Sequence, residues 1–372
     1  MKIIGGQVFD LEQGFVEKEL CANGALISAV SGDEAVVDAS GCYVIPGLVD
    51  VHFHGCVGED FSDASAEGLR AIADYQLSQG VAYICPAGMT LSEEQLAAVC
   101  ATAAAHRKSG ATGAEVVGAH LEGPFLSMAK KGAQNGDYLH DPDIGMFNRL
   151  QTAAEGCVKL ISIAPELPGA MEFIEEASKT VTVSLAHTAA NYDIATEAFQ
   201  KGARHVTHMF NAMPPFSHRA PGVVGAAADD KNVRVEIISD GIHLHGAVVR
   251  SVFTLFGKER VVLISDSMRA TGLSDGQYTL GGQDVTVKGK LATLADGTIA
   301  GSATNLMGCL RQAIAFGIPA ADAVRAASYN PACAIGIEDR VGTLDEGKEA
   351  SFVLLDREDL SIRAVVFKGA KI

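Results

Sequence analysis

Two histidines near the start of the chain have the spacing of metal ligands. His52 and His54 follow an apolar run and are separated by one residue. Because side chains on a strand alternate between its two faces, both imidazoles would point in the same direction. Asp50 could orient one of them from behind. The pair alone is equally compatible with two structural histidines at the end of a strand.

Further candidate ligands follow later apolar runs: Glu122, His187, His208 and Asp266. Taken singly, each could be a packed or capping residue. We interpret His120 as a histidine that supports a ligand or packs in the interior, and not as a ligand itself. Together they favour a divalent ion, because imidazole and carboxylate suit Zn²⁺ or Fe²⁺ better than Mg²⁺ or Ca²⁺. Asp266 would act as general base toward a water on the ion and as general acid toward a leaving nitrogen.

A long segment from Asn211 to Gly222 could bind an anion. It carries His218 and Arg219, and long loops in barrels are commonly functional. Arg219, together with His243 further along the chain, could hold a phosphate through charge-assisted hydrogen bonds. Taken singly, each of these charges would more often be a solvated surface group.

The elements that must position these residues are eight apolar runs of strand length. The runs are Gly47–His54, Val81–Pro86, Val116–Leu121, Lys159–Ala164, Val181–Ala186, His205–His208, Arg234–Ser239 and Arg260–Ser265. Helical patterns separate most of them, at Ser65–Ser78, Ser92–Lys108, Pro168–Lys179 and Asn191–Lys201. Ser92 with Gln95 fits a capping box. Alternating β and α units predict an α/β fold, a (β/α)₈ TIM-like barrel with its active site at the carboxyl ends of the strands.

The two ends of the chain have a different pattern. The first 45 residues alternate short β-type runs with turn residues, which predicts a small antiparallel sheet. The last 30 residues look the same, so we expect both ends to form one small β-sandwich domain. The expected division is 1–46 and 341–372 for that domain and 47–340 for the barrel. Three extra short strands are expected after the eighth barrel strand, at Tyr278–Leu280, Asp284–Val287 and Ala292–Leu294.

Composition limits the kinds of partner. The 372 residues carry a formal net charge of −16, which disfavours nucleic acid and anionic membranes as partners. The eight cysteines are scattered and include no Cys-x-x-Cys pair, which is typical of reduced thiols. Neither a signal peptide nor a membrane span is recognisable. We therefore expect a cytoplasmic protein.

Several segments resemble the amidohydrolase superfamily. Pro46–Gly55, with its His-x-His, resembles the first barrel strand that many members share. Other segments resemble the N-acetylglucosamine-6-phosphate deacetylases in particular: His120–Phe125, His208–Gly222, Ser239–His243, Ser265–Met268 and Asp296–Ser302. The resemblance runs nearly from end to end. Glu122 stands where dihydroorotase-like and urease-like relatives have a carboxylated lysine, which disfavours those activities.

The resemblance implies a role for each candidate residue. The ligands of the main metal ion would be Glu122, His187 and His208, and those of a second ion His52, His54, Glu122 and Asp266. Asp266 would be the catalytic acid and base. The contacts to the sugar phosphate would be Asn211, the backbone of Ala212, Arg219 and His243, with His218 reaching the substrate of the neighbouring subunit in a homodimer. One or two ions of Zn²⁺ or Fe²⁺ are expected per chain.

The expected function is hydrolysis of the acetamide of N-acetylglucosamine 6-phosphate, in amino-sugar catabolism or cell-wall recycling. A deacetylase for the galactosamine epimer would need the same catalytic groups. Another amidohydrolase activity, such as that of a deaminase or cyclic amidase, is a further alternative. A catalytically inactive barrel serving as a binding scaffold is the alternative outside enzymes.

Overall fold

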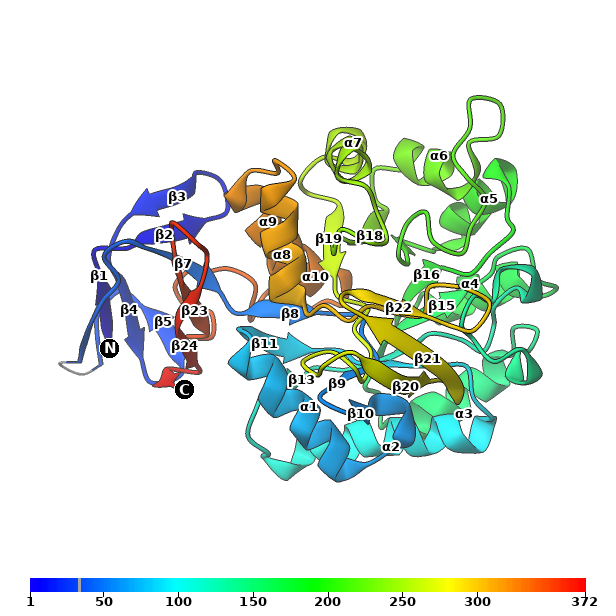
Figure 1. Ribbon diagram of the computed structural model, residues 1–372, viewed down its shortest axis with the longest axis horizontal. Coiled ribbons are helices and arrows are strands. Elements are labelled where there is room, and N and C mark those ends of the chain that lie inside the picture. The colour runs from blue at the N-terminus through cyan, green and yellow to red at the C-terminus, as the bar shows by residue number, and fades with distance from the viewer. Residues whose placement is uncertain (33–34) are drawn as a thin grey trace.

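The computed structural model describes residues 1–32 and 35–372 and has a curled parallel sheet at its centre (Figure 1). One part pairs β8 (Leu48–Asp50), β11 (Val81–Ile84) and β13 (Glu115–Val116). The other runs in the order β12 (Ala87–Gly88), β14 (Ala119–Leu121), β15 (Val158–Ile163), β16 (Thr182–Leu185), β17 (His205–Val206), β18 (Arg234–Ile238) and β19 (Val261–Ile264). The two parts are continuous, because β12 and β14 prolong β11 and β13 after short breaks. Asp33 and Glu34, which belong to the predicted segment 1–46, lie outside the described residues.

Each of the eight predicted runs overlaps a strand, but seven of these strands end earlier than predicted, and β14 ends at Leu121 as its run did. The first run reached His54, whereas β8 ends at Asp50, and the sixth reached His208, whereas β17 ends at Val206. No ladder pairs β19 with β8 in the described part of the chain. The backbone N–H of Asp266, just after β19, nevertheless donates a hydrogen bond to the carbonyl of His52 at 2.9 Å. The first and last strands of the curled sheet therefore meet at their carboxyl ends.

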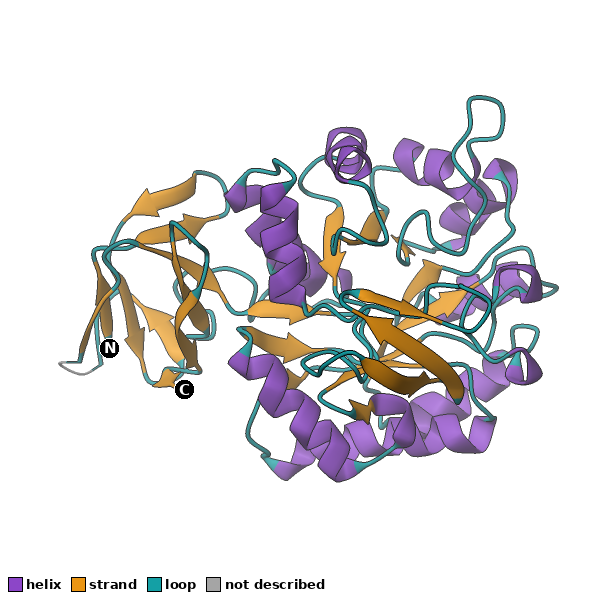
Figure 2. Cartoon of the chain, in the orientation of Figure 1, coloured by secondary structure: helices purple, strands orange, loops and turns teal. Residues whose placement is uncertain are grey.

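Helices cover the outside of this sheet (Figure 2). They are α1 (Ala66–Ser78), α2 (Glu93–Ser109), α3 (Ile144–Ala153), α4 (Ala170–Ala177), α5 (Tyr192–Lys201), α6 (Gly222–Asp229), α7 (Gly246–Phe256), α8 (Leu306–Ala315), α9 (Ala320–Ala327) and α10 (Tyr329–Ala334). The predicted starts Ser65, Ser92 and Asn191 are N-caps whose side chains accept backbone hydrogen bonds. The predicted capping box of Ser92 and Gln95 is present.

Strands from both ends of the chain share one six-stranded sheet. Its order is β25 (Ala370–Lys371), β24 (Ile362–Phe367), β23 (Phe352–Asp356), β7 (Cys42–Pro46), β2 (Gln7–Asp10) and β3 (Gly14–Glu17). A second sheet has the order β5 (Leu26–Ser28), β4 (Leu20–Asn23), β1 (Lys2–Ile4) and β6 (Val36–Asp38). Side chains of both sheets, such as Ile3 and Val44, pack in one buried cluster.

The prediction that the N-terminal segment is an antiparallel sheet is wrong in part. The pairs β1–β4 and β2–β3 are antiparallel, but β1–β6 and β2–β7 are parallel. The reason is the path of the chain, which leaves each sheet to form strands of the other before it returns. Strands β6 and β7 therefore run in the same direction as the first strand of each sheet.

An inserted antiparallel sheet lies near the carboxyl ends of the parallel strands. It comprises β20 (Gly276–Leu280), β21 (Gln283–Lys288) and β22 (Leu291–Thr293), as predicted. Its buried side chains Leu280 and Val285 pack with Met89 and Met268, which follow strands of the parallel sheet. Among the described residues, no helix combines the length and the apolar character needed to cross a membrane.

Candidate functional site

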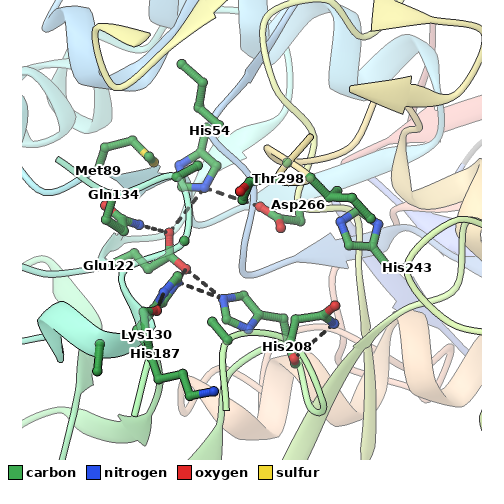
Figure 3. Close-up of a pocket in the computed structure, with 18 residues that line it drawn as sticks. His54, Met89, Glu122, Lys130, Gln134, His187, His208, His243, Asp266 and Thr298 are labelled. Carbon is green, nitrogen blue, oxygen red and sulfur yellow. Dashed lines mark hydrogen bonds and ion pairs between the residues drawn. The ribbon is translucent and has the colours of Figure 1, made fainter. Parts of the chain in front are cut away.

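A cavity of about 400 Å³ lies at the carboxyl ends of the parallel strands (Figure 3). Eight of the residues predicted to be functional line it: His54, Glu122, His187, His208, Asn211, Ala212, His243 and Asp266. His52 is fully buried beside Glu122. His218 and Arg219 are not part of the cavity wall and are exposed to solvent. The predicted metal ligands are therefore together, and two of the predicted phosphate or subunit contacts lie apart from them.

Three of the predicted ligands have a backbone conformation that is rare for residues other than glycine. The φ angle is 43° at His187, 27° at His208 and 48° at Asp266. A strand needs a negative φ, so each of these residues ends the extended backbone. Left-handed residues of this kind gather at functional sites, where the surrounding structure holds them in place. At His208, the last residue of its predicted run, this explains why β17 does not reach the end of that run.

Glu122 is the centre of the first group of ligands. Its Oε1 lies 3.0 Å from Nε2 of His208, 3.2 Å from Nε2 of His187 and 3.3 Å from Nε2 of His52. The Nε2 atoms of His187 and His208 are 3.1 Å apart. Ligand atoms bound about 2.0–2.1 Å from a tetrahedral ion lie roughly 3.3 Å from one another. The three edges of this triangle are close to that value.

The other oxygen of Glu122 faces a second group. Its Oε2 lies 3.3 Å from Nε2 of His54, which in turn lies 3.2 Å from Oδ1 of Asp266. His52 approaches the same Asp266 oxygen at 3.8 Å. The two carboxylate oxygens of Glu122 thus serve two adjacent sets of ligand atoms. An arrangement of this kind can hold two divalent ions with a shared carboxylate.

Hydrogen bonds on the far side of three of the imidazoles determine where the lone pair points, whereas Nδ1 of His208 has no hydrogen-bond partner among the described residues. Nδ1 of His187 donates to the carbonyl of Lys130 at 2.8 Å, and Nδ1 of His54 donates to the carbonyl of Ala87 at 3.0 Å. Nδ1 of His52 donates to the carboxylate of Glu236 at 2.9 Å. Because these acceptors have no proton to give, a neutral ring carries its lone pair on Nε2. In the neutral form the Nε2 lone pairs face carboxylates, an arrangement that a metal ion between them would stabilise.

The electrostatics of the group also call for positive charge. Burial lowers the pKa of His54, but Asp266 and Glu122 outweigh it and raise that pKa to about 10. Burial raises the pKa of Glu122, but the charge of His52 and hydrogen bonds from the histidines hold it well below its usual value. The pKa of Asp266 is lowered as well, because His54 and His52 outweigh its burial. Both carboxyl groups are therefore anionic, and either protonated histidines or a metal ion can balance their charge.

His243 forms another part of the cavity wall. Its Nδ1 donates to Oδ2 of Asp240 at 2.8 Å. Burial lowers the pKa of His243, but the hydrogen bond and charge of Asp240 outweigh burial and raise it. A protonated His243 at the cavity wall is a suitable partner for a phosphate. Asn211 and Ala212 line the same cavity, and Ala212 has a φ of 51°.

Sequence reasoning missed two polar residues that support the ligands. Nε2 of Gln134 donates to Oε2 of Glu122 at 2.7 Å, and its Oε1 accepts from the backbone N–H of Thr90 at 2.8 Å. Glu236, in the middle of β18, supports His52. The signal for Glu236 was present, since an acid within an otherwise apolar strand needs a buried partner. Gln134 lies in an irregular segment, where nothing in the sequence pattern indicates its contact.

His120 is the packed histidine that the sequence suggested. Its Nε2 lies 2.9 Å from the hydroxyl of Ser162 and its Nδ1 lies 3.3 Å from the carbonyl of Val51. Burial lowers its pKa to about 3, so the ring is neutral. Both of its nitrogens have partners, which leaves neither for an ion.

Comparison with protein families and curated proteins gives a consistent result. The model of the Amidohydrolase family matches residues 43–371. The N-acetylglucosamine-6-phosphate deacetylase of Bacillus subtilis is 36% identical over 88% of this chain and 83% of its own length. The N-acetylgalactosamine-6-phosphate deacetylase of Escherichia coli O157:H7 is 33% identical over 94% of this chain and 92% of its own length.

A solved structure also superposes closely. It is a mutant of the N-acetyl-D-glucosamine-6-phosphate deacetylase of Mycobacterium smegmatis, with an aspartate replaced by alanine, in complex with N-acetyl-D-glucosamine-6-phosphate. The match has a TM-score of 0.91 and 34% sequence identity, and it covers 100% of this chain and 98% of the other. The similarity therefore extends over the whole fold.

Proposed function

Since the chain belongs to the amidohydrolase family and, within it, to the N-acetylglucosamine-6-phosphate deacetylases, we propose that it deacetylates N-acetylglucosamine 6-phosphate. The products are glucosamine 6-phosphate and acetate. The observation that carries the proposal is the arrangement of Glu122, His187 and His208 around one point, with Asp266 at the edge of the same cavity. Amino-sugar catabolism or cell-wall recycling would use such a reaction.

Glu122, His187 and His208 would hold the main metal ion, and His52, His54, Glu122 and Asp266 a second one. The donor set suits Zn²⁺ or Fe²⁺, and one or two ions per chain are proposed. When bound, the ion would polarise the acetyl carbonyl and lower the pKa of the attacking water toward about 7. The tautomers fixed by Lys130, Ala87 and Glu236 supply the lone pairs that this binding needs.

Asp266 would be the residue that moves the proton. Its carboxylate accepts a proton from the attacking water as the water oxygen bonds to the acetyl carbon. It then donates that proton to the nitrogen as the carbon–nitrogen bond breaks, which releases acetate and the free amine. The low pKa of Asp266 keeps it anionic before the reaction, as a general base must be.

The substrate contacts proposed from the sequence fall into two sets. Asn211, the backbone of Ala212 and His243 line the cavity and can reach a bound sugar phosphate directly. Arg219 and His218 lie on the exposed segment before α6. We assign Arg219 to the phosphate and His218 to the substrate of the neighbouring subunit, in a homodimer. Their exposure in this chain is compatible with a contact that another subunit completes.

The remaining architectural and cellular predictions are part of the same proposal. A closed (β/α)₈ barrel over 47–340 is supported by the hydrogen bond between Asp266 and His52. A β-sandwich domain from 1–46 and 341–372 is supported by the buried cluster that the two terminal sheets share. The cytoplasmic location stays a prediction.

A deacetylase for N-acetylgalactosamine 6-phosphate is the second candidate, favoured by the identity to the Escherichia coli relative. Acetate release from the two epimeric phosphates and from unphosphorylated N-acetylglucosamine distinguishes the possibilities. We expect the glucosamine phosphate to have the highest kcat/KM and the unphosphorylated sugar the lowest. Metal-loaded protein that releases no acetate from either phosphate would overturn the proposal and favour another amidohydrolase activity or an inactive scaffold.

A further inference from the structure

We propose that Glu236 is a positioning residue that makes His52 a metal ligand and so determines whether the second ion binds. The inference rests on the proposed metal centre. Glu236 does not line the cavity and lies beneath it, on the interior side of β18. It would touch neither substrate nor ion and would act only through the residues that it contacts.

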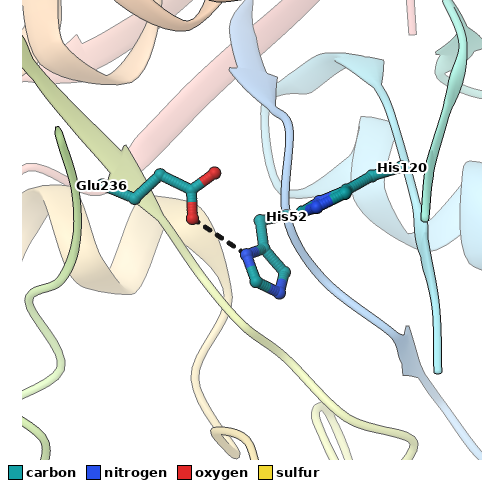
Figure 4. A group of neighbouring side chains, drawn as sticks. All are labelled: His52, His120 and Glu236. Carbon is teal, nitrogen blue, oxygen red and sulfur yellow. Dashed lines mark hydrogen bonds and ion pairs between the residues drawn. The ribbon is translucent and has the colours of Figure 1, made fainter. Parts of the chain in front are cut away.

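One oxygen of Glu236 contacts both groups of ligands. Its Oε2 accepts a hydrogen bond from Nδ1 of His52 at 2.9 Å (Figure 4) and another from the backbone N–H of His208 at 3.1 Å. His52 belongs to the proposed second site and His208 to the main site. Glu236 therefore contacts a residue of each proposed metal site.

The carboxylate of Glu236 has few other ways to balance its charge. The side chain is fully buried, and a buried carboxylate without a partner is costly. Within the described residues its Oε1 has no hydrogen-bond partner, and Nδ1 of His205 lies 3.7 Å from that atom. Among the side chains around it, His52 is thus the main hydrogen-bond partner of the Glu236 carboxylate.

The same cluster is not itself a metal site. His52, His120 and Glu236 have ligand atoms close enough to hold an ion. Both nitrogens of His120, however, are engaged by Ser162 and Val51, and Nδ1 of His52 is engaged by Glu236. Figure 4 shows His52 between the other two residues, bonded to the carboxylate. The cluster therefore orients His52 and does not compete with the cavity for metal.

The hydrogen bond to Glu236 affects both the orientation of the His52 ring and the donor strength of its Nε2. With its Nδ1–H held by Glu236, the lone pair on Nε2 points toward Glu122 and Asp266, and the carboxylate makes that nitrogen a stronger donor. Loss of such a support typically weakens metal binding by about 10- to 100-fold. The main site should lose less, because its contact with Glu236 is through the backbone of His208 and not through a ligand side chain.

The test is titration of metal-free protein with Zn²⁺ alone, followed by calorimetry or a competing chelating dye. Wild type should bind two ions, and Glu236→Gln should bind the second about 10- to 100-fold more weakly while the first changes less than threefold. Glu175→Gln, an exposed acid on α4, is the matched control and should bind both ions as wild type does. If Glu236→Gln does not fold, Glu236→Asp keeps the charge but withdraws the oxygen from His52 and should also weaken the second ion.

A double substitution provides a second check. In a His52→Ala background, which already lacks the second ion, adding Glu236→Gln should cause no further loss of Zn²⁺. Unchanged affinity for both ions in Glu236→Gln, or in Glu236→Asp where Glu236→Gln does not fold, overturns the inference. Active wild type that binds only one ion overturns it too and leaves the proposed function intact. Wild type that binds two ions but releases no acetate overturns the proposed function alone.

Discussion

Oδ1 of Asp266 lies 3.2 Å from Nε2 of His54, while the backbone N–H of Asp266 is bonded to the carbonyl of His52. The two contacts join the residue after the last parallel strand to the residues after the first. They hold the carboxylate of Asp266 over the cavity in a left-handed backbone conformation, with a φ of 48°. An acid restrained in this way has a fixed position relative to every proposed metal ligand.

Asp266→Asn should therefore lower kcat far more than it changes substrate affinity. The amide keeps the shape of the side chain but cannot accept the proton of the attacking water. General acid–base catalysis is worth about 10²–10⁴-fold, and we expect kcat to fall at least that much. Rapid-quench turnover and equilibrium binding of the substrate measure the two effects separately. Near-wild-type kcat in a variant that retains its main ion would show that another residue moves the proton.

Metal removal should abolish activity, and the two proposed sites should respond differently to substitution. His187→Ala removes a ligand of the main site and should leave protein that Zn²⁺ or Fe²⁺ cannot reactivate. His52→Ala should keep one ion per chain, because Glu122, His187 and His208 remain. Metal content after dialysis, measured by mass spectrometry, checks both. A His52→Ala protein that still binds two ions would contradict the proposed division of ligands.

Gln134 should contribute to metal affinity through Glu122. Gln134→Leu keeps the approximate volume but removes the 2.7 Å hydrogen bond to Glu122 and leaves the N–H of Thr90 without its acceptor. We expect affinity for the second ion, whose ligands include Oε2 of Glu122, to fall about 10- to 100-fold, as for other residues that orient ligands. Competition with a chelating dye measures the change, with Gln277→Leu, an exposed residue of β20, as control. Equal affinity in the two variants would limit Gln134 to a packing role.

Arg219 should affect binding of the phosphate. Arg219→Ala should raise KM for the 6-phosphate substrate by at least tenfold, because a charge-assisted contact is lost. The unphosphorylated sugar should be a poor substrate of both proteins. Arg70→Ala, on α1 and away from the cavity, is a control for lost surface charge. A KM that changes equally in the two variants would assign Arg219 to the solvated surface.

A pH-dependent contribution to stability is expected at the contact between the parallel sheet and the C-terminal part of the chain. Glu115, on β13, lies 2.9 Å from Arg340 and 2.5 Å from Lys368. Burial raises the pKa of Glu115, but these two cations outweigh it and lower it below 4.5. Because the pKa of Glu115 is lower in the folded state than in the unfolded state, its ionised form stabilises the folded protein at pH values above the unfolded-state pKa. This stabilisation is lost as the pH falls through the folded-state pKa.

Glu115→Gln should accordingly cost about 1 kcal/mol of unfolding free energy at pH 7 and progressively less below pH ~4.5. Urea unfolding at a series of pH values measures the difference from wild type. Glu155→Gln, which removes a more exposed partner of Lys108, should cost less. A penalty that is constant from pH 7 to pH 3 would mean that the charge of Glu115 is not the cause.

Much of this site could be predicted because its ligands stand at the ends of strands. Apolar runs are visible in a sequence, and the polar residue that ends each run is visible with it, as at His187 and Asp266. Helix starts such as Ser65 and Ser92 were predictable for a similar reason, since a cap is a local interaction between neighbours in the chain. These features depend on a few consecutive residues.

The supports of the ligands could not be predicted in the same way. Glu236 and His52 are 184 positions apart, and only the closing curvature of the sheet brings them together. The contact of Gln134 with Glu122 depends on the path of an irregular segment. The exposure of Arg219 agrees with what a single charged residue suggests, but its separation from the cavity could not be foreseen from the irregular segment around it. Contacts of this kind follow from the assembled fold and not from local pattern.

The place of β7 in the six-stranded sheet has a consequence for biosynthesis. One edge of β7 pairs with β2, which the ribosome makes early, and the other pairs with β23, which it makes after all the parallel strands. Until β23 emerges, a nascent chain carries a strand with an open edge. Open strand edges recruit other chains, so translation that pauses or stops before Phe352 should produce aggregates even when every metal ligand has already been made.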